Sequence, residues 1–191
     1  MRNNLIVIPF NLPWEWSTDY TNQTAYILSK ENFVICYMWS ESRSLKEYAQ
    51  RHVLPEILKR HLKNLYLFYP IFLIPFRRFK TIIDLNEKIN FLFLRFLIKY
   101  FEFTIRLKGK IIWIFDPKTR YLTDYLGKDL KVIYDCVDFW SAAGMTKKEK
   151  KEIERKEKAL TKSADLVTAI SKVLQKHLQR YRKDVRLVPQ G

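Results

Sequence analysis

Short apolar segments alternate with helix-like segments through the second half of the chain, and this alternation limits the possible folds more than any other feature. Helical patterns occupy residues 118–126, 147–163 and 171–181. Strand-like apolar runs flank them at residues 110–115 (KIIWIF), 131–134 (KVIY), 166–169 (LVTA) and 185–188 (VRLV). Such alternation predicts βαβ units and a parallel sheet. Because the strands are apolar throughout, both faces of that sheet should be buried.

The first forty residues follow the same order. Residues 5–10 (LIVIPF) and 33–38 (FVICYM) favour buried strands, and a helix through residues 24–29 lies between them. A chain of 191 residues with 48% apolar residues is long enough for one domain with a packed core. We therefore expect residues 1–191 to form an α/β domain, with a Rossmann-like parallel sheet and helices on both faces.

The middle of the chain, residues 41–108, departs from this pattern as a basic and aromatic insert, which we expect to be helical. From Lys46 to Lys80 there are eight Lys or Arg and two Glu, beside the apolar stretches 65–79 and 89–105. These stretches either pack against each other as helices under a long loop, or form an apolar face in a membrane interface. In the second case four basic residues would lie at the headgroups. They are Arg77, Arg78, Lys80 and Arg95.

The charge of the chain favours anionic partners. Lys and Arg total 35 against 20 Asp and Glu, a formal net charge of +15, which suits nucleic acid, acidic lipids or phosphorylated ligands. Two cysteines, Cys36 and Cys136, are too few for a disulfide scaffold, and no Cys/His set has zinc spacing. With no signal peptide and no run of 18 apolar residues to form a spanning helix, we expect a cytoplasmic protein that can lie peripherally on the inner face of the cell membrane.

Ligands of open parallel sheets bind outside the carboxyl ends of the strands, which directs attention to the polar residues there. The first such loop, NLPWEW, has no glycine, which disfavours a dinucleotide-binding G-x-G-x-x-G turn; a P-loop is absent from the sequence. Trp14 and Trp16 flank Glu15 in this loop. The two tryptophans either form a stacking platform for a sugar or base, or cover the sheet edge as part of the core.

The segment 134–140 (YDCVDFW) places Asp135 and Asp138 where a strand ends. These carboxylates would accept hydrogen bonds from sugar hydroxyls, act as a base, or cap a helix. Two oxygen ligands are too few to indicate a metal. Ser171 begins a helix directly after a strand, which suits either phosphate binding or an ordinary N-cap. Gly191, the last residue, is a candidate for close approach to a ligand.

The order of these motifs resembles the amino-terminal half of GT-B glycosyltransferases. YDCVD, the charged helix, ADLVTAIS and VRLVPQG match a family pattern of YDxxD, an acidic-basic helix, aDLVxxxS and a strand ending in (N or Q)-G-V-D. The closest likeness is to family 4-like enzymes that build cell-envelope polysaccharides, teichuronic-acid transferases among them. Residues 131–191 match well, LPWEW and NQTAYILSK resemble the family's first loop and helix, and the middle insert matches poorly.

The resemblance implies an acceptor-side domain that faces a donor-binding domain. This chain lacks the donor half, so catalysis is expected only when a donor-binding domain in the same or another chain completes the enzyme. The partners implied are a nucleotide-sugar, used as co-substrate, and a saccharide or lipid-linked acceptor; no tightly bound cofactor and no metal are expected. The implied substrate-binding residues are Trp14, Glu15, Trp16, Asp135, Asp138, Ser171 and Gly191, with Asp135 and Asp138 as catalytic candidates.

An alternative class remains open. A stand-alone, non-catalytic Rossmann-like module that binds nucleic acid or an anionic membrane also fits the charge of +15. The absence of RNP1, KH or zinc-finger motifs disfavours nucleic acid as the partner.

Overall fold

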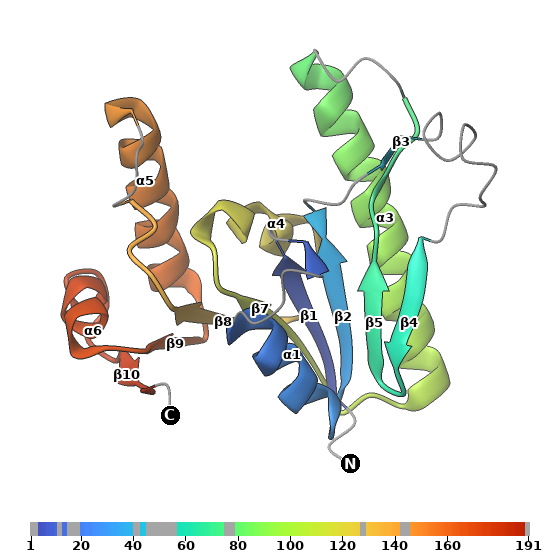
Figure 1. The fold of residues 1–191 in the computed structure, drawn as a ribbon, viewed down its shortest axis with the longest axis horizontal. Helices are drawn as coiled ribbons and strands as arrows, with labels where there is room; N and C mark the ends of the chain where they lie inside the picture. The colour runs from blue at the N-terminus through green and yellow to red at the C-terminus, as the bar shows by residue number, and fades with distance from the viewer. Residues whose placement is uncertain are drawn as a thin grey trace. The chain divides into compact units, whose positions relative to one another are not determined.

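The computed structural model describes residues 4–10, 13–14, 20–39, 43–44, 57–74, 79–126, 129–141 and 146–189. The chain divides into two units, Met1–Lys110 and Ile111–Gly191, which are described in turn. Both units combine parallel strands with helices (Figure 1). The predicted α/β class with a Rossmann-like parallel sheet is therefore confirmed.

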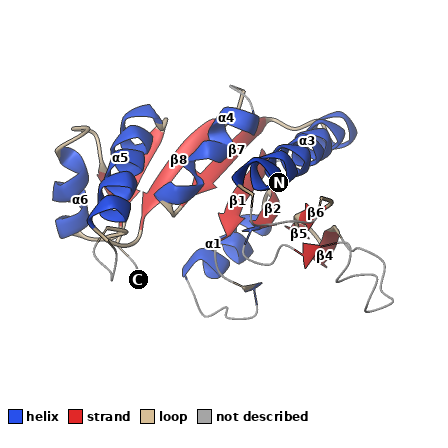
Figure 2. Ribbon diagram, turned by 90° about the horizontal axis from the view of Figure 1, so that it is seen from above, coloured by secondary structure: helices blue, strands red, loops and turns tan. Residues whose placement is uncertain are grey.

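Three parallel strands form the sheet of the first unit. Strand β2 lies between β1 and β5, and the antiparallel strand β4 pairs with β5 at the outer edge. Helices α1 and α3 cover opposite faces of this sheet (Figures 1 and 2). Strands β3 and β6 form a separate short parallel pair. The bounds are β1 (Asn4–Phe10), α1 (Tyr20–Ser29), β2 (Phe33–Met38), β3 (Arg43–Ser44), β4 (Leu58–Leu62), β5 (Leu65–Phe68), β6 (Ile71–Phe72) and α3 (Lys80–Ile105).

Aromatic side chains fill the space between this sheet and α3. Tyr37 of β2 stacks on Phe68 of β5 with ring centroids 5.5 Å apart, and it lies 5.8 Å from Phe91 of α3. Further along, Phe33 packs against Phe101. Side chains two residues apart on a strand share one face, so β2 directs Phe33, Ile35 and Tyr37 to α3 and the alternate residues Val34, Cys36 and Met38 toward α1.

Two buried asparagines on the same face of α3 hold the extended segment that contains β6. Asn90 Oδ1 accepts a hydrogen bond from the Ile71 N–H (2.9 Å), and its Nδ2 donates to the Ile71 carbonyl (2.8 Å). Four residues earlier, Asn86 makes the same two bonds to Ile74, each 3.0 Å long. These amides satisfy backbone groups as a neighbouring strand would, and they fix the rotation of α3 about its axis. We call this pair the asparagine clamp.

The sheet of the second unit is parallel throughout, and its strands β7, β8, β9 and β10 pair in chain order. Helices α5 and α6 follow β8 and β9 and lie side by side (Figures 1 and 2). The bounds are β7 (Gly109–Ile114), the 3-10 helix η3 (Pro117–Tyr121), α4 (Leu122–Leu126), β8 (Lys131–Cys136), α5 (Lys147–Ser163), β9 (Leu166–Ala169), α6 (Lys172–Gln179) and β10 (Arg186–Leu187).

Local hydrogen bonds explain where the helices of the second unit begin. Thr146 and Glu149 form a capping box at the start of α5. Ser171 caps α6, and Asp116 caps η3 by accepting a 2.8 Å bond from the Lys118 N–H. The highly charged sequence of α5 is helical because it follows such a cap and buries Ile153 and Leu160 on one face.

The expectation of a helix over residues 65–79 was wrong for the residues described there. Leu65–Phe68 and Ile71–Phe72 are strands β5 and β6, whereas the predicted helix over 89–105 is confirmed as part of the longer α3. The runs on either side of Pro70 are too short for helices and rich in aromatic residues, which favours strands.

Candidate functional site

Three polar residues follow three neighbouring strands of the second unit. Asp116 follows β7, Asp138 follows β8 and Ser171 follows β9, and these strands are parallel neighbours. Their carboxyl ends therefore lie at one edge of the sheet, which is where open α/β sheets bind ligands. We call this the carboxyl edge of the second unit.

The two predicted carboxylates of the YDCVD motif have different environments. Asp135 is only 2% exposed; its Oδ1 accepts a 2.6 Å bond from Thr168 Oγ1 and its Oδ2 a 3.3 Å bond from Trp113 Nε1. These contacts join β7, β8 and β9. Asp138 is exposed, and its Oδ1 accepts a 2.7 Å bond from the Phe139 N–H. Of the two, Asp138 is the carboxylate that faces solvent, whereas Asp135 supports the sheet.

Ser171 is an N-cap. Its Oγ accepts a 3.3 Å bond from the Leu174 N–H, and its carbonyl accepts the first helical bond, from the Gln175 N–H at 2.9 Å. The capping role is thus the one that the structure supports.

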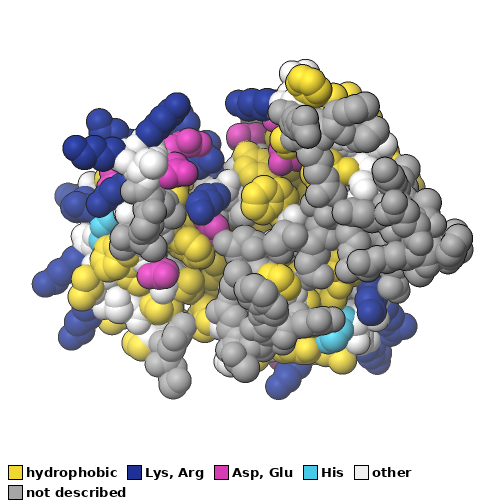
Figure 3. All heavy atoms as spheres, turned by 45° about the horizontal axis from the view of Figure 1, so that its top comes forward, with side chains coloured by type: hydrophobic (Ala, Val, Ile, Leu, Met, Phe, Trp, Pro, Cys, Tyr) yellow, Lys and Arg dark blue, Asp and Glu magenta, His cyan; other side chains and the backbone are white. Residues whose placement is uncertain are grey.

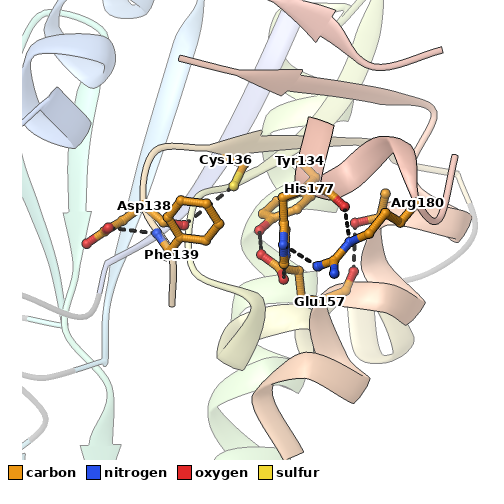
Figure 4. Close-up of polar contacts among 8 residues, drawn as sticks. Tyr134, Cys136, Asp138, Phe139, Glu157, His177 and Arg180 are labelled. Atoms are coloured by element: carbon orange, nitrogen blue, oxygen red, sulfur yellow. Dashed lines mark hydrogen bonds and ion pairs between the residues drawn. The ribbon is translucent and has the colours of Figure 1, made fainter. Parts of the chain in front are cut away.

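A buried polar network holds α6 against α5 and β8 (Figure 4). Glu157 is 2% exposed and accepts bonds at both oxygens, from Tyr134 Oη (2.9 Å) and from His177 Nε2 (2.8 Å). Because Arg180 donates to His177 Nδ1, the proton of a neutral His177 lies on Nε2. Burial is the main reason why the pKa of the Tyr134 hydroxyl lies well above its ordinary value. The network holds the last turn of α6 against α5 and β8.

Sequence reasoning missed this network, since neither Glu157 nor His177 is among the predicted site residues. A signal was present, because Glu157 lies at helical spacing from Ile153 and Leu160, both buried. A carboxylate within such an apolar stripe indicates a buried partner.

A pocket of about 180 Å³ lies between η3 and the first half of α5, the elements that follow β7 and β8. Two cations and two carboxylates surround one apolar side chain in it: Lys118, Lys156, Glu149, Glu152 and Ile153. Lys156 Nζ pairs with Glu152 at 3.0 Å. The pKa of Glu149 is lowered by its hydrogen bonds with Thr146. Figure 3 shows Lys and Arg side chains gathered around Asp and Glu on this part of the surface.

Two buried donors near this edge have no hydrogen-bond partner within the described part of the chain. They are Arg120 Nε, in η3, and Trp140 Nε1, in the segment after β8. A buried donor without a partner is costly unless water or a ligand satisfies it. The carboxyl edge therefore carries unused donors as well as the exposed Asp138 carboxylate.

The remaining predicted site residues lie elsewhere. Trp14, in the first unit, is 6% exposed and packs against Phe10, Tyr26 and His61 at centroid distances of 5.2 to 5.5 Å. It belongs to the core, the second of the two alternatives for the tryptophans. Glu15, Trp16 and Gly191 lie outside the described residues, as do Arg77 and Arg78. Lys80 and Arg95 are exposed on α3.

No group of three His, Cys, Asp or Glu side chains is placed to hold a metal ion within the described residues. Among the described helices, none is long and apolar enough to cross a membrane.

Comparison with known proteins gives structural matches only. No family model matches the chain, and no curated protein matches its sequence. Sucrose-phosphate synthase from Thermosynechococcus elongatus superposes with a TM-score of 0.59 at 14% identity, over 100% of this chain and 48% of that one. A shorter structure of the same enzyme gives a TM-score of 0.55 at 15% identity, over 99% of this chain and 90% of that one.

An α,α-trehalose-phosphate synthase (UDP-forming) from Burkholderia vietnamiensis gives a TM-score of 0.51 at 11% identity, over 100% of this chain and 49% of that one. The chain thus spans about half the length of the two longer structures. At such identities the likeness concerns the fold alone. The chain has the Rossmann-like fold of a GT-B glycosyltransferase domain.

Proposed function

We propose that this chain supplies the acceptor-side half of a glycosyltransferase. The complete enzyme would move a hexose from a nucleotide-sugar to a cell-envelope polysaccharide or lipid-linked acceptor. The observation that carries the proposal is the carboxyl edge of the second unit, where Asp138, the pocket beside Lys118 and two unused donors follow adjacent parallel strands. The fold shared with two sugar-phosphate synthases supports it.

Each residue at this edge has a role that its chemistry suits. The Asp138 carboxylate would accept hydrogen bonds from sugar hydroxyls. The Lys118 ammonium would attract a phosphate of the donor or of a lipid-linked acceptor. Asp135 would act only by holding β7, β8 and β9 in place, because both of its oxygens already accept hydrogen bonds.

The donor-binding half would come from the rest of a longer gene product or from a second chain. The mass of the native product separates these cases. A mass of about twice 23.2 kDa would place both halves in one polypeptide, as expected for two domains of this size. Assays should therefore use the native product, with its partner chain where there is one.

The test compares substitutions at the carboxyl edge with substitutions at the amino end of β8. Asp138→Asn and Lys118→Met alter the carboxyl edge. Asp129→Asn and Lys131→Met change the same residue types, both exposed, before or at the start of β8. Transfer or hydrolysis is measured by release of nucleotide from a panel of nucleotide-sugars. We expect kcat/KM to fall about 10-fold or more for the first pair, since a hydrogen bond to a charged group contributes on the order of 2 kcal/mol.

The matched pair at the amino end should stay within about twofold of the unsubstituted protein, and all four variants should keep its thermal unfolding midpoint. If none of the nucleotide-sugars is turned over, or if Asp138→Asn behaves like Asp129→Asn, the proposal is wrong.

A further inference from the structure

Helix α3 carries an apolar stripe on its outer face. Phe103 is 90% exposed, Leu92 66%, Phe96 64% and Leu85 45%. They are seven, four and seven residues apart in sequence, so they lie along one line of the helix, about 27 Å long at 1.5 Å per residue. At about 100° per residue this line is opposite the face buried by Asn90, Leu94 and Phe101. Such a set of exposed large side chains marks an interaction surface.

The stripe cannot turn inward by rotation of the helix. The asparagine clamp fixes Asn86 and Asn90 to the backbone of Ile71 and Ile74 through four hydrogen bonds of 2.8 to 3.0 Å. Rotating α3 would break these bonds and bury backbone groups without partners, which is costly. The exposed face is therefore a fixed feature of the first unit.

Basic side chains flank the stripe. Lys88, Arg95 and Lys99 are exposed along one side of it. The carboxylates on that side are Asp84 and Glu102, near the two ends, and Glu102 is paired with Lys99 at 3.0 Å and with Lys110 at 2.9 Å. Over residues 80–108 there are six Lys or Arg and three Asp or Glu, a net charge of +3 within a chain of +15.

We propose that the outer face of α3 binds the surface of an anionic lipid bilayer. The stripe would enter the boundary between headgroups and acyl chains, and the Lys and Arg flank would lie among the phosphates. Large apolar and aromatic side chains with a cationic border are what interfacial helices use, and each basic residue strengthens attraction to an acidic leaflet. A second copy of the chain is disfavoured as occupant, because two such faces would bring like charges together.

This inference goes beyond the proposed function and does not depend on it, since membrane binding is measured without any sugar substrate. Flotation uses the purified chain with vesicles of phosphatidylcholine alone or with about one-third phosphatidylglycerol. Leu92→Ser/Phe96→Ser removes the middle of the stripe. Ile27→Ser, at a side chain that is 63% exposed on α1, is the matched control on the opposite face of the sheet. We expect binding to the anionic vesicles, reduced at least about tenfold by the double substitution and unchanged by the control.

A second measurement locates the contact. Both native thiols are buried, so a cysteine placed at Phe103 or Ile27 is the site that an environment-sensitive dye will label. On adding anionic vesicles, the dye at position 103 should shift to shorter wavelength and be quenched by brominated lipid, while the dye at position 27 does neither.

Three results would overturn the proposal. Absence of flotation with anionic vesicles at low salt is the first. The second is flotation that Leu92→Ser/Phe96→Ser leaves intact, which would mean adsorption by net charge alone. The third is a chain that does not bind vesicles but dimerises as its concentration rises, with the dimer abolished by the same two substitutions. That result would make the face an interface between copies of the chain.

Discussion

At the scale of single residues, burial decides what a reactive side chain does in this chain. Asp135 and Asp138 are three residues apart, yet one is held by Trp113 and Thr168 inside the sheet and the other faces solvent. The same holds for the thiols. Burial raises the pKa of Cys136 to about 12, and it also raises the pKa of Cys36 well above its ordinary value.

Because these thiols are buried, we expect the free energy of unfolding to fall in alkali. An unfolded thiol loses its proton near pH 9, whereas folded Cys136 keeps it until about pH 12, so deprotonation favours the unfolded chain as the pH rises from 9 toward 12. The slope is at most about 1.4 kcal/mol per pH unit for each thiol. Urea unfolding between pH 8 and pH 10 measures it, and Cys136→Ala should reduce the decline.

Tyr134, whose pKa is also raised, adds to the decline only above about pH 10. Below pH 10 the comparison with Cys136→Ala therefore isolates the thiol. Equal slopes for the two proteins, or rapid modification of native Cys136 by a thiol reagent at pH 8, would contradict the burial argument.

At the scale of elements, a few hydrogen bonds hold helices in place. The asparagine clamp connects α3 to the segment 71–74, and the Glu157–His177 contact connects α5 to α6. In both cases a buried polar group sits within an otherwise apolar helix face, so removal of one partner leaves the other without a hydrogen bond.

Asn90→Ala should therefore destabilise the chain by about 2–4 kcal/mol, because the N–H and carbonyl of Ile71 both lose their partner inside the protein. The free energy of unfolding in urea measures the loss. Thr104→Ala is the matched control on the same helix, since its hydroxyl bonds to the Tyr100 carbonyl at an exposed position. We expect less than about 0.5 kcal/mol for the control. Similar values for both variants would mean that the clamp contributes little.

The sequence predicted the elements whose signals are local. The strands of the second unit, α5 with its charged surface and the Ser171 cap follow from apolar runs and capping residues. Partners distant in sequence could not be predicted in this way. His177 meets Glu157 twenty residues away, and the buried Trp14 packs against the exposed ring of His61. Residues 65–74 were misjudged because short apolar runs have no period that separates a helix from a strand.

At the scale of the whole molecule, the net charge of +15 predicts weak attraction to any polyanion. Single-stranded RNA should bind at about 50 mM salt and lose at least about tenfold in affinity by 200 mM, as expected for phosphate contacts alone. Fluorescence anisotropy with RNAs of two unrelated sequences measures this. Sequence preference, or affinity that persists at 200 mM salt, would favour the nucleic-acid alternative over the glycosyltransferase.

The edge strand β4 has a consequence for how the protein behaves at high concentration. It is the outermost strand of the first unit, with exposed residues from Lys59 to Leu62. An open edge invites other chains to add as strands, and positive charge discourages this. Here Lys59 and Arg60 supply that charge, and the Arg60 guanidinium also donates to the carbonyls of Leu62 and Lys63. The basic character of this segment thus protects the chain from aggregation, whatever it contributes to binding.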